Sequence, residues 1–96
     1  MSDLRLVDES VVTVAQEQVS CDLAGEAAIL NLKNGVYYGL DPVGARVWSL
    51  IQKPLTFSEL RTKLLQEYEV ETSSLDSDLR ELLAGLHGHG LIQVTM

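Results

Sequence analysis

The residues whose chemistry could bind a metal ion are few in this sequence. Two histidines stand in the tripeptide His87-Gly88-His89, and the single cysteine is Cys21. A zinc site needs about four ligands, so these residues would have to converge with carboxylates from elsewhere in the chain. In the simpler interpretation, the histidines end a helix and Cys21 is a small core residue. We therefore expect no metal site.

Nucleophilic catalysis and phosphate binding are not indicated either. A nucleophilic Cys21 would need a histidine base nearby, and the sequence places none close to it. Gly35, Gly39 and Gly44 lack the lysine and the spacing of a phosphate-binding loop. The sequence thus predicts a protein without catalytic residues and without a cofactor, whose function is binding.

The length and composition are those of one folded domain. The chain has 96 residues, of which 46% are hydrophobic and 22% charged, so we expect a single domain over residues 1–96 with residues 1–10 frayed. No apolar run approaches the ~20 residues that span a bilayer, and the N-terminus has no secretory signal. A single cysteine cannot form an internal disulfide, which fits the cytoplasm.

The charge is strongly acidic. The net charge is −7, because 14 acidic residues outweigh seven basic ones. A nucleic-acid surface needs clustered Lys and Arg, which this sequence lacks. The acidic surface either only aids solubility or faces a partner with some basic character. Acidic residues gather late in the chain, offset only by Arg80: Glu67, Glu69, Glu71, Asp76, Asp78 and Glu81.

A hairpin is the strongest local prediction. Asn34-Gly35 between two apolar runs predicts a two-residue type I′ turn, which would place Leu32 opposite Tyr37. Both faces of this hairpin are fairly apolar, so we expect helices to cover one of them. One face would carry Leu30, Leu32 and Tyr37, and the other Ile29, Val36, Tyr38 and Leu40.

Three helices are predicted in the second half of the chain by their end residues and by apolar side chains at helical spacing. Side chains of Asp, Ser and Thr accept hydrogen bonds at a helix start, while proline and glycine end a helix. The starts are Asp41 before Pro42, Thr56 with Glu59 as a capping box, and Ser73 or Ser74, and the stops are Lys53-Pro54, Gly88 and Gly90.

The order of elements predicts an α+β domain. Strands over residues 11–15 and 19–23 and the hairpin precede the helices, and residues 91–95 form a short C-terminal strand. Helices two and three followed by a strand resemble a winged helix-turn-helix, so a nucleic-acid-binding or regulatory protein is the alternative function. The third helix begins Ser-Ser-Leu-Asp-Ser-Asp, however, and these carboxylates would repel phosphates.

The sequence around the hairpin resembles a known family. Residues 34–48 read Asn-Gly-Val-Tyr-Tyr-Gly-Leu-Asp-Pro-Val-Gly-Ala-Arg-Val-Trp. This stretch resembles the PqqD-like proteins, in which Gly, aromatics, Leu and Asn or Asp precede a small-residue helix start and then Val-Trp or Ile-Trp. The resemblance continues through residues 56–60 and 82–92, and covers roughly residues 10 to 95.

The resemblance implies a fold and a function. Such proteins are non-catalytic recognition elements for ribosomally made, modified peptides, with a three-stranded antiparallel sheet packed on three helices. A leader segment of the precursor binds as an added strand between the third strand and the third helix. Free-standing copies of this length resemble those of lasso-peptide pathways, which present the precursor to a leader-cleaving peptidase and an ATP-dependent cyclase. The redox-cofactor branch usually has a Pro-Glu-Gly-type segment where this chain has Lys33-Asn34-Gly35, which favours the lasso type.

The physical properties of the predicted third strand agree with peptide binding. Residues 36–40 contain no proline or charge that would protect an exposed edge, although they could simply be core and edge residues. We expect the leader to lie along this strand in either direction, with no nucleic acid or membrane as partner. Leu79 and Leu83 would line an apolar pocket or lie in the core, and Asp76 and Arg80 would hold polar leader groups. The candidate peptide-binding residues are Val36, Tyr37, Tyr38, Gly39 and Leu40 from the strand and Asp76, Leu79, Arg80 and Leu83 from the helix.

Overall fold

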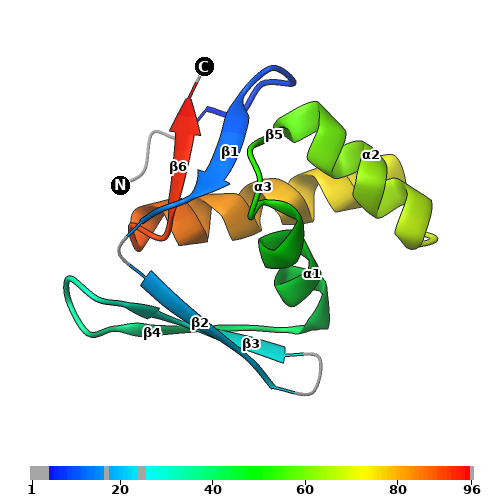
Figure 1. Ribbon diagram of the computed structural model, residues 1–96. Coiled ribbons are helices and arrows are strands. Elements are labelled where there is room, and N and C mark those ends of the chain that lie inside the picture. Colours follow the sequence, from blue (N-terminus) through cyan, green and yellow to red (C-terminus); the bar gives the residue numbers. More distant parts are fainter. Residues whose placement is uncertain (1–4, 17, 24–25, 96) are drawn as a thin grey trace.

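Three helices lie between two small antiparallel sheets (Figure 1). The computed structural model describes residues 5–16, 18–23 and 26–95, and only the backbone of residues 19–23, 26 and 27. The α+β class, the three helices and the three-stranded sheet are confirmed, and a second sheet is added. In chain order the elements are β1 (Val11–Val14), β2 (Gln18–Leu23), β3 (Glu26–Asn31), β4 (Tyr37–Leu40), α1 (Pro42–Leu50), β5 (Leu55–Thr56), α2 (Phe57–Glu67), α3 (Thr72–Gly88) and β6 (Ile92–Thr95).

The first sheet joins the two ends of the chain. Its strand order is β5-β1-β6, with β1 in the centre. The segment before β1 was predicted to be frayed, but part of it is packed against the rest of the protein. Leu6 is 5% exposed and Ser10 is fully buried, and the Ser10 carbonyl accepts from the N–H of Phe57 at 2.8 Å. Residues 6–10 therefore pack against the start of α2, and the expectation for residues 1–4 lies outside the described residues.

The second sheet has the order β2-β3-β4 and contains the predicted hairpin. Leu30 lies opposite Tyr37, so the predicted pairing of Leu32 with Tyr37 was wrong by two residues. The turn is longer because two asparagine side chains stabilise it: Oδ1 of Asn31 accepts from the N–H of Lys33 at 2.9 Å, and Oδ1 of Asn34 accepts from the N–H of Val36 at 3.0 Å.

The two faces of the hairpin are nevertheless as predicted. A shift of two residues leaves each side chain on the same face, whereas a shift of one would exchange the faces. Ile29 is fully buried and Leu40 is 5% exposed, while Tyr37 on the other face is 70% exposed. Gly35 has a φ of 71°, which glycine adopts without strain.

The first two helices begin where the sequence predicts. The Asp41 carboxylate accepts from the N–H of Gly44 at 2.7 Å, next to the proline at the start of α1. Thr56 and Glu59 form the capping box of α2, with hydrogen bonds of 2.9 and 3.1 Å. Helix α1 ends at Leu50, a few residues before the predicted stop. The Asp41 cap fixes the start of α1 directly after β4.

Helix α3 begins earlier than its serines indicate. It starts at Thr72 after Glu71, and no side chain caps it, so the expected cap at Ser73 or Ser74 was wrong. The N–H of Leu75 already bonds to the Glu71 carbonyl at 3.0 Å, because burial of Leu75 in the core draws the preceding turn into the helix. At the other end Gly90, with a φ of 73°, turns the chain toward β6.

The core lies between the helices and the two sheets. Its fully buried side chains come from every helix and from both sheets, which ties the helices and sheets into one hydrophobic cluster. Within the described residues no helix is long and apolar enough to cross a membrane. The core includes Val12, Ile29, Val47, Ile51, Phe57, Leu60, Leu64, Leu83, Leu86 and Leu91.

Candidate functional site

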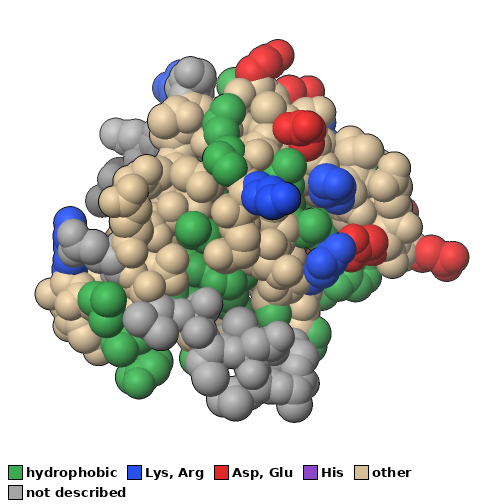
Figure 2. Space-filling model, viewed as in Figure 1, with side chains coloured by type: hydrophobic (Ala, Val, Ile, Leu, Met, Phe, Trp, Pro, Cys, Tyr) green, Lys and Arg blue, Asp and Glu red, His purple; other side chains and the backbone are tan. Residues whose placement is uncertain are grey.

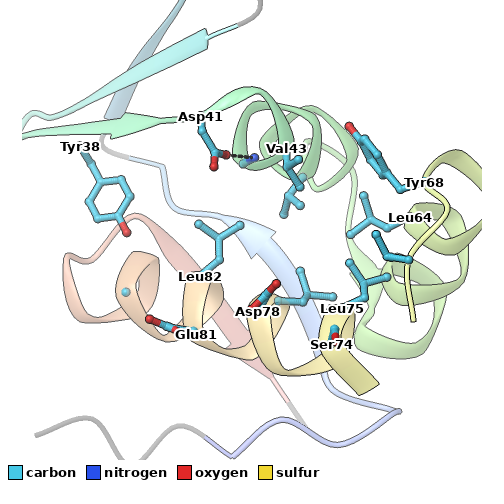
Figure 3. Close-up of a pocket in the computed structure, with 15 residues that line it drawn as sticks. Tyr38, Asp41, Val43, Leu64, Tyr68, Ser74, Leu75, Asp78, Glu81 and Leu82 are labelled. Atoms are coloured by element: carbon cyan, nitrogen blue, oxygen red, sulfur yellow. Dashed lines mark hydrogen bonds between the residues drawn. The ribbon is translucent and has the colours of Figure 1, made fainter. Parts of the chain in front are cut away.

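A groove runs between α3 on one side and β4 with the start of α1 on the other (Figure 3). Its volume is about 680 Å³, and residues at the end of α2 close it at one side. In Figure 3, Val43 on α1 and Leu75 and Leu82 on α3 extend into the space between the two walls. The aliphatic lining consists of Val43, Val47, Leu64, Val70, Leu75, Leu79 and Leu82.

Carboxylates are the charged groups of this groove. Asp41, Asp78 and Glu81 line it, and no Lys, Arg or His is among its lining residues. Asp41 is engaged by the N–H of Gly44. Asp78 and Glu81 are exposed and make no hydrogen bond or ion pair with any described residue. The groove is therefore negative, with two carboxylates available to a ligand.

The arginines near α3 are engaged on its other flank. Arg80 Nε donates to Asp76 at 2.7 Å, and Arg61 donates to Asp76 at 3.0 Å and to Asp8 at 2.9 Å. Arg80 also donates to the Leu6 carbonyl at 2.6 Å. Hydrogen bonds from Arg80 and then Arg61 lower the pKa of Asp76. This cluster links α2, α3 and the segment before β1, outside the groove.

The open edge of β4 lies beside the groove. The N–H of Asn31 donates to the Val36 carbonyl at 3.0 Å, and these two residues are opposite each other in the register that pairs Leu30 with Tyr37. Hydrogen-bonded and non-bonded pairs alternate along an antiparallel ladder. The N–H and C=O groups of Tyr37 and Gly39 therefore point away from β3. Among the described strands none pairs with β4 at that edge.

Tyr38 crosses from β4 toward α3 (Figure 3). It is half-buried, and its ring meets the edge of the His89 ring with centroids 4.8 Å apart. Nδ1 of His89 lies 2.8 Å from the Gly85 carbonyl, which agrees with the predicted place of the histidines at a helix end. The hydroxyl of Tyr38 lies close to Gly85 on α3.

The structure brings together only part of the predicted site. From the predicted strand, Tyr38 lines the groove, Gly39 lies on the open edge, and Leu40 is 5% exposed in the core. Val36 and Tyr37 are exposed near the tip of the hairpin, where Figure 2 shows hydrophobic side chains gathered. The backbone of Tyr37 still faces the open edge, so its predicted role rests on main-chain atoms.

The four predicted residues of α3 do not share one environment. Leu79 lines the groove, while Leu83 is fully buried in the core. Asp76 and Arg80 pair with each other, and the Arg80 guanidinium lies 4.8 Å from the centre of the Phe57 ring. Neither charged residue reaches the groove, so their predicted contact with a ligand has no geometric support.

Sequence reasoning missed the other flank of α3. The leucine stripe of this helix faces the core, and polar residues flank it on both sides. Helical spacing places Ser74, Asp78, Glu81 and Gly85 on one flank and Asp76 and Arg80 on the other. Spacing alone cannot decide which flank faces β4. Asp76 and Arg80 are four residues apart and of opposite charge, so an ion pair between them could have been predicted. That prediction would have removed both residues from the candidate peptide-binding set.

No metal site is visible in the described part of the chain. Within residues 5–16, 18–23 and 26–95, no three His, Cys, Asp or Glu side chains lie close enough to hold a metal ion. The side chain of Cys21 lies outside the described residues. The arrangement is an apolar groove with acidic groups, beside a strand edge that offers backbone donors and acceptors.

The comparisons with known proteins give a family and two similar structures. Residues 26–92, more than half of the chain, match the family described as Coenzyme PQQ synthesis protein D (PqqD). A solved structure described as "TbiB1 in Complex with the TbiA(beta) Leader Peptide" is 32% identical, with a TM-score of 0.79 over 84% of this chain and 94% of that one. Another, "Lasso peptide synthetase B1 complexed with the leader peptide", is 20% identical, with a TM-score of 0.75 over 85% of this chain and 96% of that one, and shows the same fold. The curated proteins contain no match. The chain therefore belongs to the PqqD family.

Proposed function

We propose that this protein binds the leader segment of a ribosomally made precursor peptide as a strand added to the open edge of β4. The observation that carries the proposal is the position of this edge beside the groove under α3. The outward N–H and C=O groups of Tyr37 and Gly39 give an added strand main-chain partners, and the groove gives its side chains apolar contacts. Backbone bonds supply affinity and the groove supplies selectivity.

The relative that is 32% identical supports the same function. Its structure is described as a complex with a leader peptide, and the alignment covers most of both chains. The leader direction along β4 stays open, because an outer strand can accept either a parallel or an antiparallel partner. Five residues of added strand cover about 17 Å, which suffices for two or three side chains toward the groove.

The groove also indicates the chemistry of the leader. Its apolar lining fits aliphatic or aromatic side chains, and Asp78 and Glu81 have no cation partner among the described residues. A leader with a basic side chain beside its apolar residues would neutralise this charge. The groove is therefore the surface at which we expect a partner with basic character to bind.

We infer a non-catalytic role in lasso-peptide maturation, in the cytoplasm. The protein would hold the precursor while a leader-cleaving peptidase and an ATP-dependent cyclase act on the remainder. The family match and the leader-peptide complex of the 32% identical relative support a role in binding a precursor, and Lys33-Asn34-Gly35 favours the lasso type. Binding along the β4 edge leaves the rest of the precursor free for such enzymes.

The geometry does not favour the nucleic-acid alternative. A recognition helix needs cationic side chains directed at phosphates. Arg46, Arg61 and Arg80 are all held in ion pairs with carboxylates. Asp78 and Glu81 lie exposed on α3 instead, so this helix would repel a phosphate backbone.

The main-chain contact can be tested at Gly39. Gly39→Pro removes an outward N–H and leaves the bonds between β3 and β4 in place, because proline is tolerated on the free side of an edge strand. Gly39→Ala is the matched control, since it keeps the N–H and its Cβ meets no atom within 4 Å. We expect Gly39→Pro to weaken binding by about tenfold, the worth of one hydrogen bond, and Gly39→Ala to bind like the wild type.

The measurement is fluorescence anisotropy with a labelled synthetic leader of the precursor encoded beside this gene, and circular dichroism confirms the fold. A wild-type protein that does not bind this leader would contradict the proposed function. Equal affinities for folded Gly39→Pro and Gly39→Ala would place the leader at another surface.

A further inference from the structure

The groove ends where Tyr38 meets α3. Lining residues on α3 extend from Ser74 to Gly85, although the helix continues to Gly88. Tyr38 is the β4 residue in the lining, and Figure 3 shows its ring extending from the strand toward the helix. The side chain thus spans the distance between the two walls at one end of the groove.

Gly85 makes this span possible. A Cβ on residue 85 would lie 2.8 Å from the Tyr38 hydroxyl, closer than real contacts allow, and 3.8 Å from Cζ of the same ring. Glycine inside a helix is unfavourable relative to alanine. The space that its missing side chain leaves is filled by the tyrosine hydroxyl, which gives a steric reason for glycine at this position.

The position of Tyr38 is restricted on other sides as well. Its ring meets His89 edge-on with an interplanar angle of 68°, and His89 is itself held near the Gly85 carbonyl. On β4 the residue lies opposite Ile29, which is fully buried. The tyrosine is therefore a fixed part of the groove rather than a loose surface side chain.

We propose that Tyr38 and Gly85 together form an end wall that limits the size of the leader side chain next to it. This inference rests on the proposed function, because it concerns the same groove. A leader strand along β4 must place its side chains between this wall and the end of α2. The wall therefore selects a small or medium side chain at one leader position and fixes the register in which the leader binds.

The first test is a double-mutant cycle with the labelled leader as probe. Gly85→Ala displaces Tyr38, and we expect about tenfold weaker binding. Tyr38→Phe removes only the hydroxyl, and its affinity is the reference against which the double variant is compared. The double variant Tyr38→Phe with Gly85→Ala relieves the 2.8 Å contact and keeps the 3.8 Å one, so we expect it to recover most of the lost affinity.

A second test measures how large a leader side chain the end wall accepts, and it needs no substitution at Gly85. A panel of leader peptides carries tryptophan at each apolar position in turn. We expect the wild type to reject tryptophan most strongly at one position, and Tyr38→Ala to restore binding of that peptide by about tenfold relative to the unmodified leader. If Tyr38 contributed only to the stability of the fold, Tyr38→Ala would weaken the binding of all the peptides equally.

The outcomes separate the two proposals. A wild type that does not bind the leader overturns the proposed function and the wall with it. A wild type that binds, together with a folded Gly85→Ala protein of unchanged affinity or a double variant without recovery, overturns the wall alone. An unchanged tryptophan profile in Tyr38→Ala has the same meaning.

Discussion

Single residues on α3 differ in function according to the flank on which they lie. Asp76 and Asp78 are two positions apart, yet Asp76 pairs with Arg80 and Arg61 while Asp78 lines the groove. An ion-paired carboxylate contributes to the fold, and an unpaired one beside an apolar groove is available for recognition. We therefore expect Asp78 and Glu81 to affect binding and Asp76 to affect stability.

Charge reversal in the groove tests this division. Asp78→Lys and Glu81→Lys should each weaken binding of a basic leader by about five- to tenfold, because a repulsive charge replaces an attractive one beside the bound leader. Glu9→Lys is the matched control, since it makes the same change of net charge at an exposed residue outside the groove. Titration of the three variants against the labelled leader is the measurement, and equal losses in all three would show that only the overall charge matters.

At the scale of elements, the ion-pair cluster ties α2, α3 and the segment before β1 together. Its partners come from three parts of the chain, with Arg61 between Asp8 and Asp76 and with Arg80 on the Leu6 carbonyl. The pairs lie at the surface, so each contributes less than about 1 kcal/mol. Their effect should be seen where the carboxylates become protonated.

Acid should therefore weaken the fold. The pKa of Asp76 is lowered in the folded state by its hydrogen bond from Arg80, so its stabilisation is present above the unfolded pKa of about 3.9. It is lost as the pH falls through the lower folded pKa. Glu59 and Glu67 have lowered pKa values as well, through bonds from Thr56 and Arg46.

Urea unfolding between about pH 7 and about pH 2.5 measures this effect. The free energy of unfolding should fall below about pH 4, and Asp76→Asn should show a smaller fall and a lower stability at neutral pH. Asp78→Asn, which loses no partner among the described residues, should follow the wild type. Identical pH profiles for Asp76→Asn and the wild type would show that the cluster does not stabilise the fold.

The elements differ in how far local sequence could predict them. The starts of α1 and α2 were predictable because Asp41 and Thr56 bond to backbone groups within the same turn. The start of α3 was not, because it depends on burial of Leu75 rather than on a cap. The hairpin faces were predictable from alternation, whereas its register depends on side-chain bonds of Asn31 and Asn34 inside the turn.

The candidate site was predictable only in part for the same reason. The strand was found because its unprotected edge is a property of residues 36–40 alone. The groove was not, because its lining comes from β4 and all three helices. Val43 and Tyr68, for example, line the same groove only in the folded chain, and no spacing rule connects them.

At the scale of the whole molecule, the net charge of −7 should guide the leader to the protein. Long-range attraction raises the rate of association and is screened by salt. We expect the association rate of a basic leader, measured by stopped-flow fluorescence, to fall several-fold between about 0.05 M and about 0.5 M salt. The dissociation rate should change less. An association rate that is independent of salt would argue against a basic leader.

The position of β1 at the centre of its sheet has a consequence for synthesis of the chain. Val11 pairs with both Thr56 and Thr95, so the first strand acquires its last partner only when residue 95 has left the ribosome. Pairing across such a distance requires a long loop to close before the contacts stabilise it, which slows folding. The N-terminal strand therefore stays without its β6 partner until residues 92–95 have been made, so the sheet that it centres forms after the residues that line the groove have been synthesised.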